Sequence, residues 1–532
     1  MKEMNRIGRG KIKITPNIVD RMVGFFDPVS AARRFKARAT MAVAGGYIGA
    51  SKSKRSLKQW FTSGLDVDSD VLLDLPTLRE RSRDLIRNTP LATGAIKTKI
   101  TNVVGTGLKL QSRIDRGALK LSEEQADKWE ASTEREWRLF WESPECDAAR
   151  TLDGNAITKL VYRQVKENGD VFIVLPRITF SWFPYDLRIQ IVEADRVCNK
   201  NNAADTDTLA GGIEKDQYGA PLNYHILKKH PGNFRYKSKK QFEWQIIPAF
   251  GSELGLRNVI HLFSPDRPGQ SRGVPDLASV IEPLKQLDRY TEAELMAAVI
   301  SGMFTVFIET GSGDTPLDLT DMSQETGSKA LDVDYKLASG AIVSLVPGEK
   351  VHDSNPGRPN AAFDPFVLSI LRQIGVALEL PFEILIKHFT ASYSAARAAL
   401  LEAWKYFISE RQWLAANFIQ IIYEIWMYEA VAKGRIVAPG FFADPLIRKA
   451  YLGAEWIGPA KGQIDELKEI NAAKKRVGMG ISTLSEVTAE MTGGDWEKKH
   501  PQSVKEYKMR KEAGLIPEQQ DKNKEDNEDE TT

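Results

Sequence analysis

The spacing of apolar positions divides the first half of the chain into helices followed by short strands. Apolar residues recur at the helical period in three stretches, which predict helices over 76–101 with a turn near Pro90, over 121–141 and over 154–167. Short β-branched and aromatic runs between turn residues predict strands over 171–175, 188–192, 224–227 and 258–263. A further strand, interrupted by two glycines, is predicted over 103–110. This order of elements predicts an α+β fold.

Helical periodicity dominates the second half of the chain. Helices are predicted over 276–301, 364–380, 396–432, 463–477 and 482–491. Between the first two lie apolar runs that predict strands over 303–308 and 341–346, with a polar segment over 310–335 between them. The longest helix would span about 55 Å at 1.5 Å per residue. Its charged residues exclude a membrane span, so an extended scaffold helix is expected and the fold is mostly α.

Composition and overall charge exclude several classes of protein. Apolar residues make up 42% of the 532 residues and charged residues 27%, which is typical of a globular chain. The net charge is only +2, so a protein that binds nucleic acid tightly over its whole surface is not expected. Cys146 and Cys198 are the only cysteines, so no disulfide framework exists. We expect neither a membrane span nor a secretory signal.

The near-neutral total conceals two oppositely charged ends. Residues 1–60 hold 14 Lys/Arg and three Asp/Glu, a local net charge of +11. Residues 511–532 hold three Lys and eight Asp/Glu, a local net charge of −5. A basic arm of this kind is either solvated or in contact with nucleic acid or an acidic partner. The acidic tail lacks aromatic residues, so it is predicted to be disordered.

The motifs of common catalytic sites are missing. The nearest approach to a phosphate-binding loop is 46–53, where a serine instead of a glycine precedes Lys52 and no strand leads in. None of the six histidines pairs with another at i,i+4, and no Gly-x-Ser-x-Gly elbow occurs. We therefore predict no catalytic residue, no bound cofactor and no metal site, and a protein that is not an enzyme. Groups that converge only on folding would escape this test.

Six sequence blocks occur in one order and at consistent spacing. They are RERSRDLIRNTPLATGAIKTKITNVVGTGLKLQSR at 79–113, NGDVFIVLP at 168–176, IQIVEADRV at 189–197, VIHLFSPDRPGQSRGVPDLASVIEPLKQLDRYTEAELMAA at 259–298, RQIGVALELPFEIL at 372–385, and PAKGQIDELKEINAAKKRVGMGISTLSEVTAEMTGGDWE at 459–497. Together they resemble the lambda-type portal family of tailed phages over residues 30–515. No single block would suffice for this resemblance.

The resemblance implies a portal fold whose regions can be assigned along the chain. They are a basic N-terminal arm (1–60), a wing (61–275), a first stem helix (276–301), a clip (302–363), a second stem helix (364–380), a tunnel loop (381–395), a long wing helix (396–454), a crown (455–510) and the acidic tail (511–532). The assembled form implied by the resemblance is a ring, expected to hold twelve copies, although the sequence does not give the number.

The resemblance also implies function, partners and location. The ring would occupy one vertex of the viral capsid, and the genome would be packaged and ejected through its channel. The implied partners are other copies of the chain, the large terminase subunit, major capsid and scaffold proteins, head-completion and tail adaptor proteins, and double-stranded DNA that passes without sequence-specific binding. No membrane is involved. The expected locations are the virion and, during assembly, the host cytoplasm.

Two groups of residues are candidates for facing the DNA channel. The stem candidates are mostly acidic and are expected to hold DNA weakly, because carboxylates repel its phosphates; they are Glu282, Lys285, Asp288, Glu292, Arg372 and Glu379. The tunnel-loop candidates are polar or basic and are expected to touch phosphates transiently; they are Lys387, His388, Thr390, Ser392 and Arg397. A solvated helix face is the simpler interpretation of the first group.

Three other functions stay open at this stage. A head–tail adaptor of the virion is one, although adaptors are usually shorter and lack the helix–strand–helix excursion over 276–380. A DNA-processing enzyme whose site is assembled in space is the second, and divalent-metal-dependent nuclease activity would favour it. A plain DNA-binding module is the third, and the net charge disfavours it.

Overall fold

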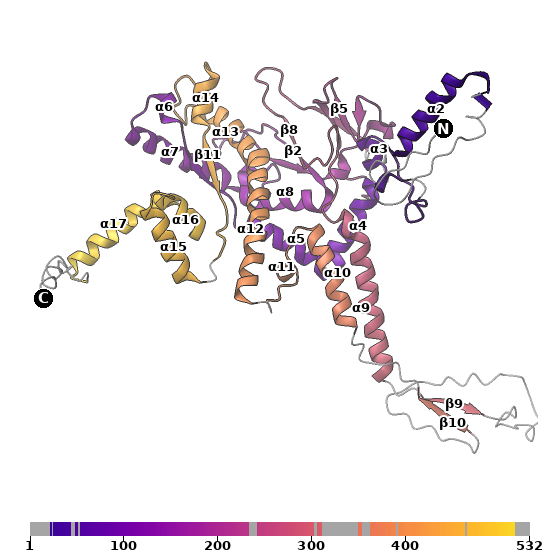
Figure 1. Ribbon diagram of the computed structural model, residues 1–532. Coiled ribbons are helices and arrows are strands. Elements are labelled where there is room, and N and C mark those ends of the chain that lie inside the picture. Colours follow the sequence, from indigo (N-terminus) through magenta and orange to yellow (C-terminus); the bar gives the residue numbers. More distant parts are fainter. Residues whose placement is uncertain are drawn as a thin grey trace, which may run out of the picture. The chain divides into compact units, whose positions relative to one another are not determined.

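The computed structural model describes residues 22–23, 25–43, 48–51, 54–233, 242–302, 306–310, 349–353, 362–389, 392–462 and 465–515. Every structural statement below concerns these residues. The chain divides into two compact units, Met1–Asp66 and Val67–Thr532. In the first unit, the described elements include helix α2 (Pro28–Val43) and the 3₁₀ turn η1 (Ile48–Ala50) (Figure 1). Much of the predicted basic arm lies outside the described residues.

The second unit begins with a run of helices. They are α3 (Val67–Val71), α4 (Leu75–Asn88), α5 (Pro90–Val103), α6 (Arg116–Leu119), α7 (Glu123–Trp141) and α8 (Gly154–Asn168). The helix predictions over 76–101, 121–141 and 154–167 correspond to α4 and α5, to α7 and to α8, whereas α3 and α6 were not predicted. Pro90 is the first residue of α5, a position where its missing N–H costs no helical hydrogen bond. The hydroxyl of Ser122 accepts a hydrogen bond from the Gln125 amide, and the Gln125 side chain accepts one from the Ser122 amide. This capping box fixes the start of α7.

The predicted strand over 103–110 is wrong for most of its length. Helix α5 continues to Val103, and strand β1 covers only Lys109–Ser112. Between them Gly105 and Gly107 have φ values of +58° and +129°, which turn the chain in a way that side-chain-bearing residues rarely allow. Strand β1 pairs antiparallel with β11 (Ala454–Ile457), from the far end of the chain. The apolar run was therefore a helix end and a turn.

Two antiparallel sheets contain the other predicted strands. One has the order β3-β2-β8 and is built from β2 (Asp170–Val174), β3 (Gln190–Val192) and β8 (Val259–Phe263). The other has the order β4-β5-β6-β7 and is built from β4 (Leu209–Ala210), β5 (Ile213–Lys215), β6 (Pro221–Leu227) and β7 (Trp244–Pro248). All five residues of β2 are buried, which explains the apolar run Val171–Val174 that follows Asp170. All four strand predictions over 171–263 are confirmed, with shifted ends.

The longest predicted helix is confirmed and organises the core. It consists of α12 (Tyr393–Leu414), a π-helical turn η8 (Ala415–Ile419) and α13 (Gln420–Ala432), which follow one another without interruption. Its buried aromatic residues meet the stripe of α7: the ring centres of Trp137 and Trp426 lie 5.2 Å apart, and those of Trp137 and Tyr423 lie 5.4 Å apart. Segments nearly 300 residues apart in sequence thus share one core.

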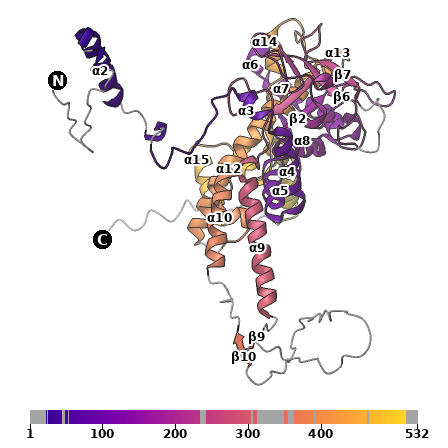
Figure 2. The same cartoon turned by 90° about the vertical axis from the view of Figure 1, so that its right-hand side faces the viewer.

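Helices α9 (Ile281–Gly302) and α10 (Phe363–Ala377) lie side by side, as Figure 2 shows. The rings of Tyr290 and Phe363 stack at 5.4 Å between them. The prediction over 276–301 began too early, because a 3₁₀ turn, η6 (Ala278–Val280), precedes α9. The prediction over 364–380 ended too late, because Glu379 has a φ of +54° and ends the helix. The short helix α11 (Phe382–Ile386) follows.

Strands β9 (Val306–Thr310) and β10 (Glu349–Asp353) pair antiparallel between α9 and α10. The strand predicted over 303–308 is therefore confirmed in part. The strand predicted over 341–346 and, apart from Thr310, the polar segment over 310–335 lie outside the described residues. The predicted order of helix, strands and helix is correct.

The C-terminal part adds α14 (Pro445–Tyr451), α15 (Glu466–Gly478), α16 (Leu484–Thr492) and α17 (Trp496–Glu512). The helices predicted over 463–477 and 482–491 correspond to α15 and α16. Helix α17 was not predicted, and it includes the first two residues of the predicted tail. The rest of that tail is outside the described residues from 516 onward. No helix in the described ranges is both long and apolar enough to cross a membrane.

Candidate functional site

The stem candidates on α9 occupy different environments. Glu282, Lys285 and Glu292 are exposed. Asp288 is half-buried, and its carboxylate accepts a hydrogen bond of 2.7 Å from the Thr89 hydroxyl at the start of α5. Asp288 therefore ties α9 to the neighbouring helices, whereas the other three candidates face outward from this chain.

The exposed stripe of α9 is balanced rather than acidic. Glu282, Lys285, Arg289 and Glu292 follow steps of three and four, so they share one face of the helix. Two carboxylates there stand beside two cations, which leaves no net charge. The sequence predicted a more negative face, because a count of acidic residues also includes Asp288. The carboxylate of Asp288 is bonded within the subunit and does not belong to the exposed stripe.

The same face of α9 becomes apolar towards the end of the helix. Leu295, Met296 and Val299 are 66%, 56% and 47% exposed, and we call them the apolar end of α9. On α10, Phe366 and Val376 are exposed as well. Apolar side chains that adjoin on one helix face and are open to water, as at the apolar end of α9, are typical of a surface that another protein covers.

The candidates that follow α10 lie beside cavities. Arg372 is exposed, and its guanidinium carbon lies 5.3 Å from the ring centre of Phe382. Glu379 is exposed at the end of α10 and lines a polar cavity of about 370 Å³ together with Lys166 and Glu410. Both candidates also line a second, more apolar cavity between α10, α11 and α12.

The tunnel-loop candidates separate into two pairs. Lys387 has a φ of +55° and ends α11, and the amide of the neighbouring His388 donates to the Glu383 carbonyl at 3.1 Å. Both side chains are exposed. Ser392 caps α12, and Arg397 is exposed on the second turn of that helix. The predicted loop over 381–395 thus contains α11 and the first residues of α12. Thr390 lies outside the described residues.

A buried charged cluster that the sequence did not predict surrounds Asp170. This carboxylate on β2 is 0% exposed and accepts from Arg79 at 2.7 Å, Arg272 at 2.6 Å and His261 at 3.2 Å. We call these four residues the Asp170 cluster. Burial raises the pKa of Asp170, but the guanidinium groups of Arg272 and Arg79 outweigh it and hold that pKa well below its ordinary value. The carboxylate stays ionised, so the cluster is a structural ion network.

A second network joins α5, α8 and α12 to the turn that precedes α9. Asp276 receives a hydrogen bond of 2.6 Å from Lys99 on α5 and faces Lys166 on α8 at 3.7 Å. Lys166 also pairs with Glu410 on α12 at 2.6 Å, and Glu410 accepts from the Tyr162 hydroxyl. Burial raises the pKa of Asp276, but the ammonium groups of Lys99 and Lys166 lower it below its ordinary value. Asp276 is therefore bonded within the subunit.

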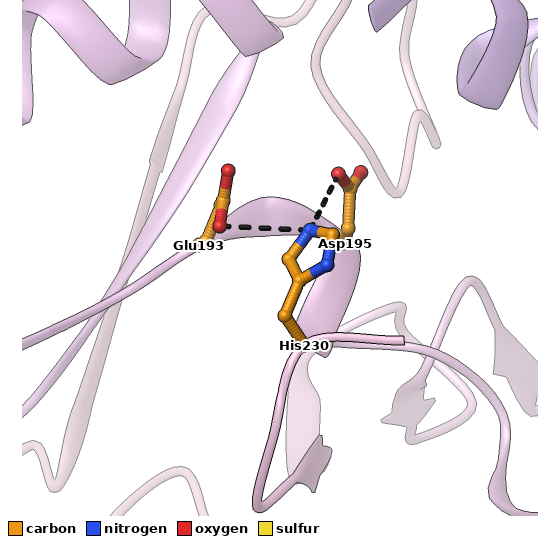
Figure 3. Close-up of side chains that lie close together, drawn as sticks. All are labelled: Glu193, Asp195 and His230. Carbon is orange, nitrogen blue, oxygen red and sulfur yellow. Dashed lines mark hydrogen bonds and ion pairs between the residues drawn. The ribbon is translucent and has the colours of Figure 1, made fainter. Parts of the chain in front are cut away.

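Glu193, Asp195 and His230 form a cluster with metal-ligating side chains (Figure 3). Their ligand atoms lie within 4.8 Å of one another, and the His230 Nε2 is 3.3 Å from Asp195 and 3.6 Å from Glu193. However, Arg83 forms ion pairs with both carboxylates, and Arg79 lies 3.6 Å from Asp195. A divalent cation there would meet two guanidinium groups. The arrangement favours an ion-pair cluster over a metal centre.

Comparisons with known proteins identify the class of this chain. A family model described as "Phage portal protein, lambda family" matches residues 53–411, about two thirds of the chain. The chain is 27% identical over 496 residues to portal protein B of Escherichia phage lambda, covering 89% of this chain and 91% of that protein. It is 26% identical over 495 residues to the portal protein of Escherichia phage N15, covering 89% and 92%.

The class is therefore that of phage portal proteins. More narrowly, the chain belongs to the lambda family of phage portal proteins. The resemblance noted in the sequence is confirmed. The role is that of a portal protein of a tailed phage, a structural component of the particle.

The comparison with solved structures finds chains from gene transfer agent particles. A chain from the neck of the empty particle aligns with a TM-score of 0.44 at 12% identity, covering 82% of this chain and 98% of that one. A chain from the neck of the native particle aligns with a TM-score of 0.41 at 11% identity, covering 78% and 92%. Scores below 0.5 do not establish a common fold, so the family assignment depends on the sequence relatives.

Proposed function

We propose that copies of this chain close into a ring whose central channel carries double-stranded DNA into and out of the viral head. The observation that carries this proposal is membership of the portal family over residues 53–411. A ring is built from heterologous contacts, so each subunit needs two different complementary surfaces. The role is structural, and ATP-driven work is left to the packaging motor.

The exposed apolar end of α9 supports the self-association part of this proposal. Leu295, Met296 and Val299 leave apolar area open to water, and burying such area stabilises contacts by about 25 cal/mol per Å². We infer that a neighbouring copy covers it. The balanced stripe of Glu282, Lys285, Arg289 and Glu292 lies nearer the start of the same helix face. At the edge of a channel, a stripe without net charge would neither attract nor strongly repel phosphates.

The regions carry separate parts of this function. Helices α9 and α10 are the stem, the segment over 302–363 is the clip, the residues around Lys387 and His388 are the tunnel loop, and α15 to α17 belong to the crown. We infer that the clip meets the large terminase subunit during packaging and the head-completion and tail adaptor proteins afterwards. Major capsid and scaffold proteins would surround the wing. The sites of action are the portal vertex of the virion and the host cytoplasm during assembly.

The decisive experiment measures the mass of the purified full-length chain in solution. Mass photometry should give a species near twelve times the subunit mass of 59.5 kDa, and negative-stain images should contain rings with a central hole. The double variant Leu295→Glu/Val299→Glu should lose this species while its circular dichroism stays unchanged, because charges in an apolar contact are costly to bury.

A matched control introduces a carboxylate at an equally exposed leucine. Leu254, in the loop after β7, is 65% exposed, so Leu254→Glu should leave the assembled mass unchanged. If the unmodified chain stays monomeric at high concentration, even with procapsid components added, the ring proposal is wrong. If rings form and both variants keep them, the contact lies elsewhere than the apolar end of α9.

A further inference from the structure

Helix α17 carries positive charge in a part of the chain that lies beyond the family match over residues 53–411. Residues 498–511 hold six Lys/Arg and one Glu, a local net charge of +5. No residue of α17 is buried. Most helices in proteins are stabilised by packing of one face, and within the described residues α17 lacks this stabilisation. A partner of opposite charge would supply it.

The first two lysines of α17 are bonded to the rest of the subunit. The Lys498 Nζ lies 2.6 Å from a carboxylate oxygen of Glu134 on α7 and 3.2 Å from one of Asp495. The Lys499 Nζ donates to the hydroxyl of Thr492 on α16 at 2.6 Å. These contacts hold the start of α17 and occupy the cations that lie there.

The remaining cations of α17 have no such counter-charge. Lys505, Lys508, Arg510 and Lys511 are exposed, and we call them the basic end of α17. Among the described residues, no carboxylate oxygen lies within ion-pair distance of any of the four. Cations at the C-terminus of a helix interact favourably with its dipole, but like charges at this spacing repel one another. The basic end therefore favours an anionic partner.

The chain leaves α17 through a turn that brings the next residues back beside the basic end. Gly514 has a φ of +67°, and its amide donates to the Lys511 carbonyl at 3.1 Å. The amide of Leu515 donates to the Arg510 carbonyl at 2.9 Å. These two bonds form a Schellman motif, which glycine allows because it has no Cβ. Leu515 thus lies beside the last turn of the helix and not beyond it.

Residues 516–532, which follow, have the opposite charge, and we call them the acidic segment. They hold seven Asp/Glu and two Lys, a local net charge of −5, and five of the acids lie within 525–530. The stretch from Leu515 to these five acids spans up to about 35–50 Å when extended. Lys505 and Lys511 lie only about 9 Å apart along the helix axis at 1.5 Å per residue. The acidic segment can therefore reach every cation of the basic end.

We propose that the acidic segment binds the basic end of α17 in the same chain and shields it from other polyanions. Opposite charge and short reach favour this occupant. Covalent linkage gives it an effective concentration in the millimolar range, so ion pairs that are weak one by one suffice to hold it. The contact is exposed, so it is reversible and depends on salt. This inference does not depend on ring formation, because both partners belong to one copy.

Carbodiimide crosslinking of the full-length chain tests the contact directly, because it joins carboxylates to lysine amines that lie close together. At about 50 mM NaCl, peptides with Lys505, Lys508 or Lys511 should be joined to peptides of the acidic segment. At about 1 M NaCl, where the Debye length falls to about 3 Å, these crosslinks should disappear. The pair of Lys498 and Glu134 is the internal control at low salt. Chains with and without ¹⁵N, mixed before assembly, show whether the two joined peptides come from one copy.

DNA binding tests the shielding. The neutral-segment variant replaces five carboxylates by amides: Glu525→Gln, Asp526→Asn, Glu528→Gln, Asp529→Asn and Glu530→Gln. It should bind a 30-base-pair duplex more tightly, and the slope of log K against log salt should rise in magnitude by about two to four. Adding Lys508→Gln/Lys511→Gln should lower the slope again by about two. Adding Lys474→Gln/Lys475→Gln, which removes two exposed cations of α15 instead, should keep the gain.

The outcomes separate the parts of this inference. If Lys498 is joined to Glu134 but no lysine of the basic end is joined to the acidic segment, the inference is wrong. Crosslinks that join only labelled to unlabelled peptides would assign the acidic segment to a neighbouring copy and disprove the contact within one chain. An equal loss of DNA binding with either pair of lysines removed would disprove the shielding. Absence of rings would disprove the proposed function and leave this contact unaffected.

Discussion

The Asp170 cluster and the apolar end of α9 differ in whether one copy of the chain provides all the contacts that their side chains need. Around Asp170 the chain buries charge and provides every counter-charge itself, from Arg79, Arg272 and His261. At the end of α9 it leaves Leu295 and Val299 open to water. A buried charge without a partner is far more costly than an exposed apolar group. The contrast teaches that the region around β2 is complete in one subunit, whereas the end of α9 leaves the apolar area that, in our proposal, another subunit covers.

The largest expected loss of stability comes from a substitution in the Asp170 cluster. Asp170→Asn keeps the shape of the side chain but leaves Arg79 and Arg272 buried without their counter-charge. The free energy of unfolding should fall by about 3–5 kcal/mol. Urea unfolding followed by tryptophan fluorescence measures this. The control Glu124→Gln breaks an exposed pair with Lys128 and should change the value by less than about 0.5 kcal/mol, and a similar loss in both variants would contradict the prediction.

A smaller loss of stability should distinguish the buried first half of α9 from its exposed end. Leu284 is 1% exposed and Leu295 is 66% exposed on the same helix. Leu284→Ala removes buried methyl groups and leaves a cavity, so it should lower the free energy of unfolding by about 2–5 kcal/mol. Leu295→Ala should change it by less than about 0.5 kcal/mol while it weakens self-association. Equal losses of stability would mean that the end of α9 is covered within one subunit.

The smallest effect is a pH dependence at the base of α9. The lowered pKa of Asp276 means that its ionised form stabilises the fold above the unfolded pKa of about 3.9. Asp276→Asn should therefore be less stable than the unmodified chain at neutral pH. The difference should begin to shrink as the pH falls below about 4 and vanish once the folded carboxyl is protonated. A difference that stays constant down to pH 2 would contradict this.

The sequence predicted elements well where neighbouring residues decide them. The aromatic stripe of Trp129, Trp137, Phe140 and Trp141 and the long pattern over 396–432 repeat at the helical period, and both became helices. The blocks in their order also identified the portal family. The prediction failed at 103–110 because apolar content was interpreted as a strand, whereas the positive φ angles of Gly105 and Gly107 make a turn.

The candidate site was predicted less well. The sequence pointed to Lys387 and His388, which are neighbours and both exposed, but it also placed Asp288 among the channel-facing residues of the stem. In the structure the Asp288 carboxylate accepts a hydrogen bond from the Thr89 hydroxyl. Exposure depends on which segment packs against a helix, and no local pattern records that.

The sequence by itself determined the class of protein and the order of its helices and strands. The class follows from the ordered sequence blocks, and the elements follow from the spacing of apolar residues that are close along the chain. The tertiary structure alone decided which charges meet. Asp170 pairs with Arg79 from 91 residues earlier and with Arg272 from 102 residues later. Such pairs form because packing of distant segments brings them together, and the chain's periodicity carries no information about that distance.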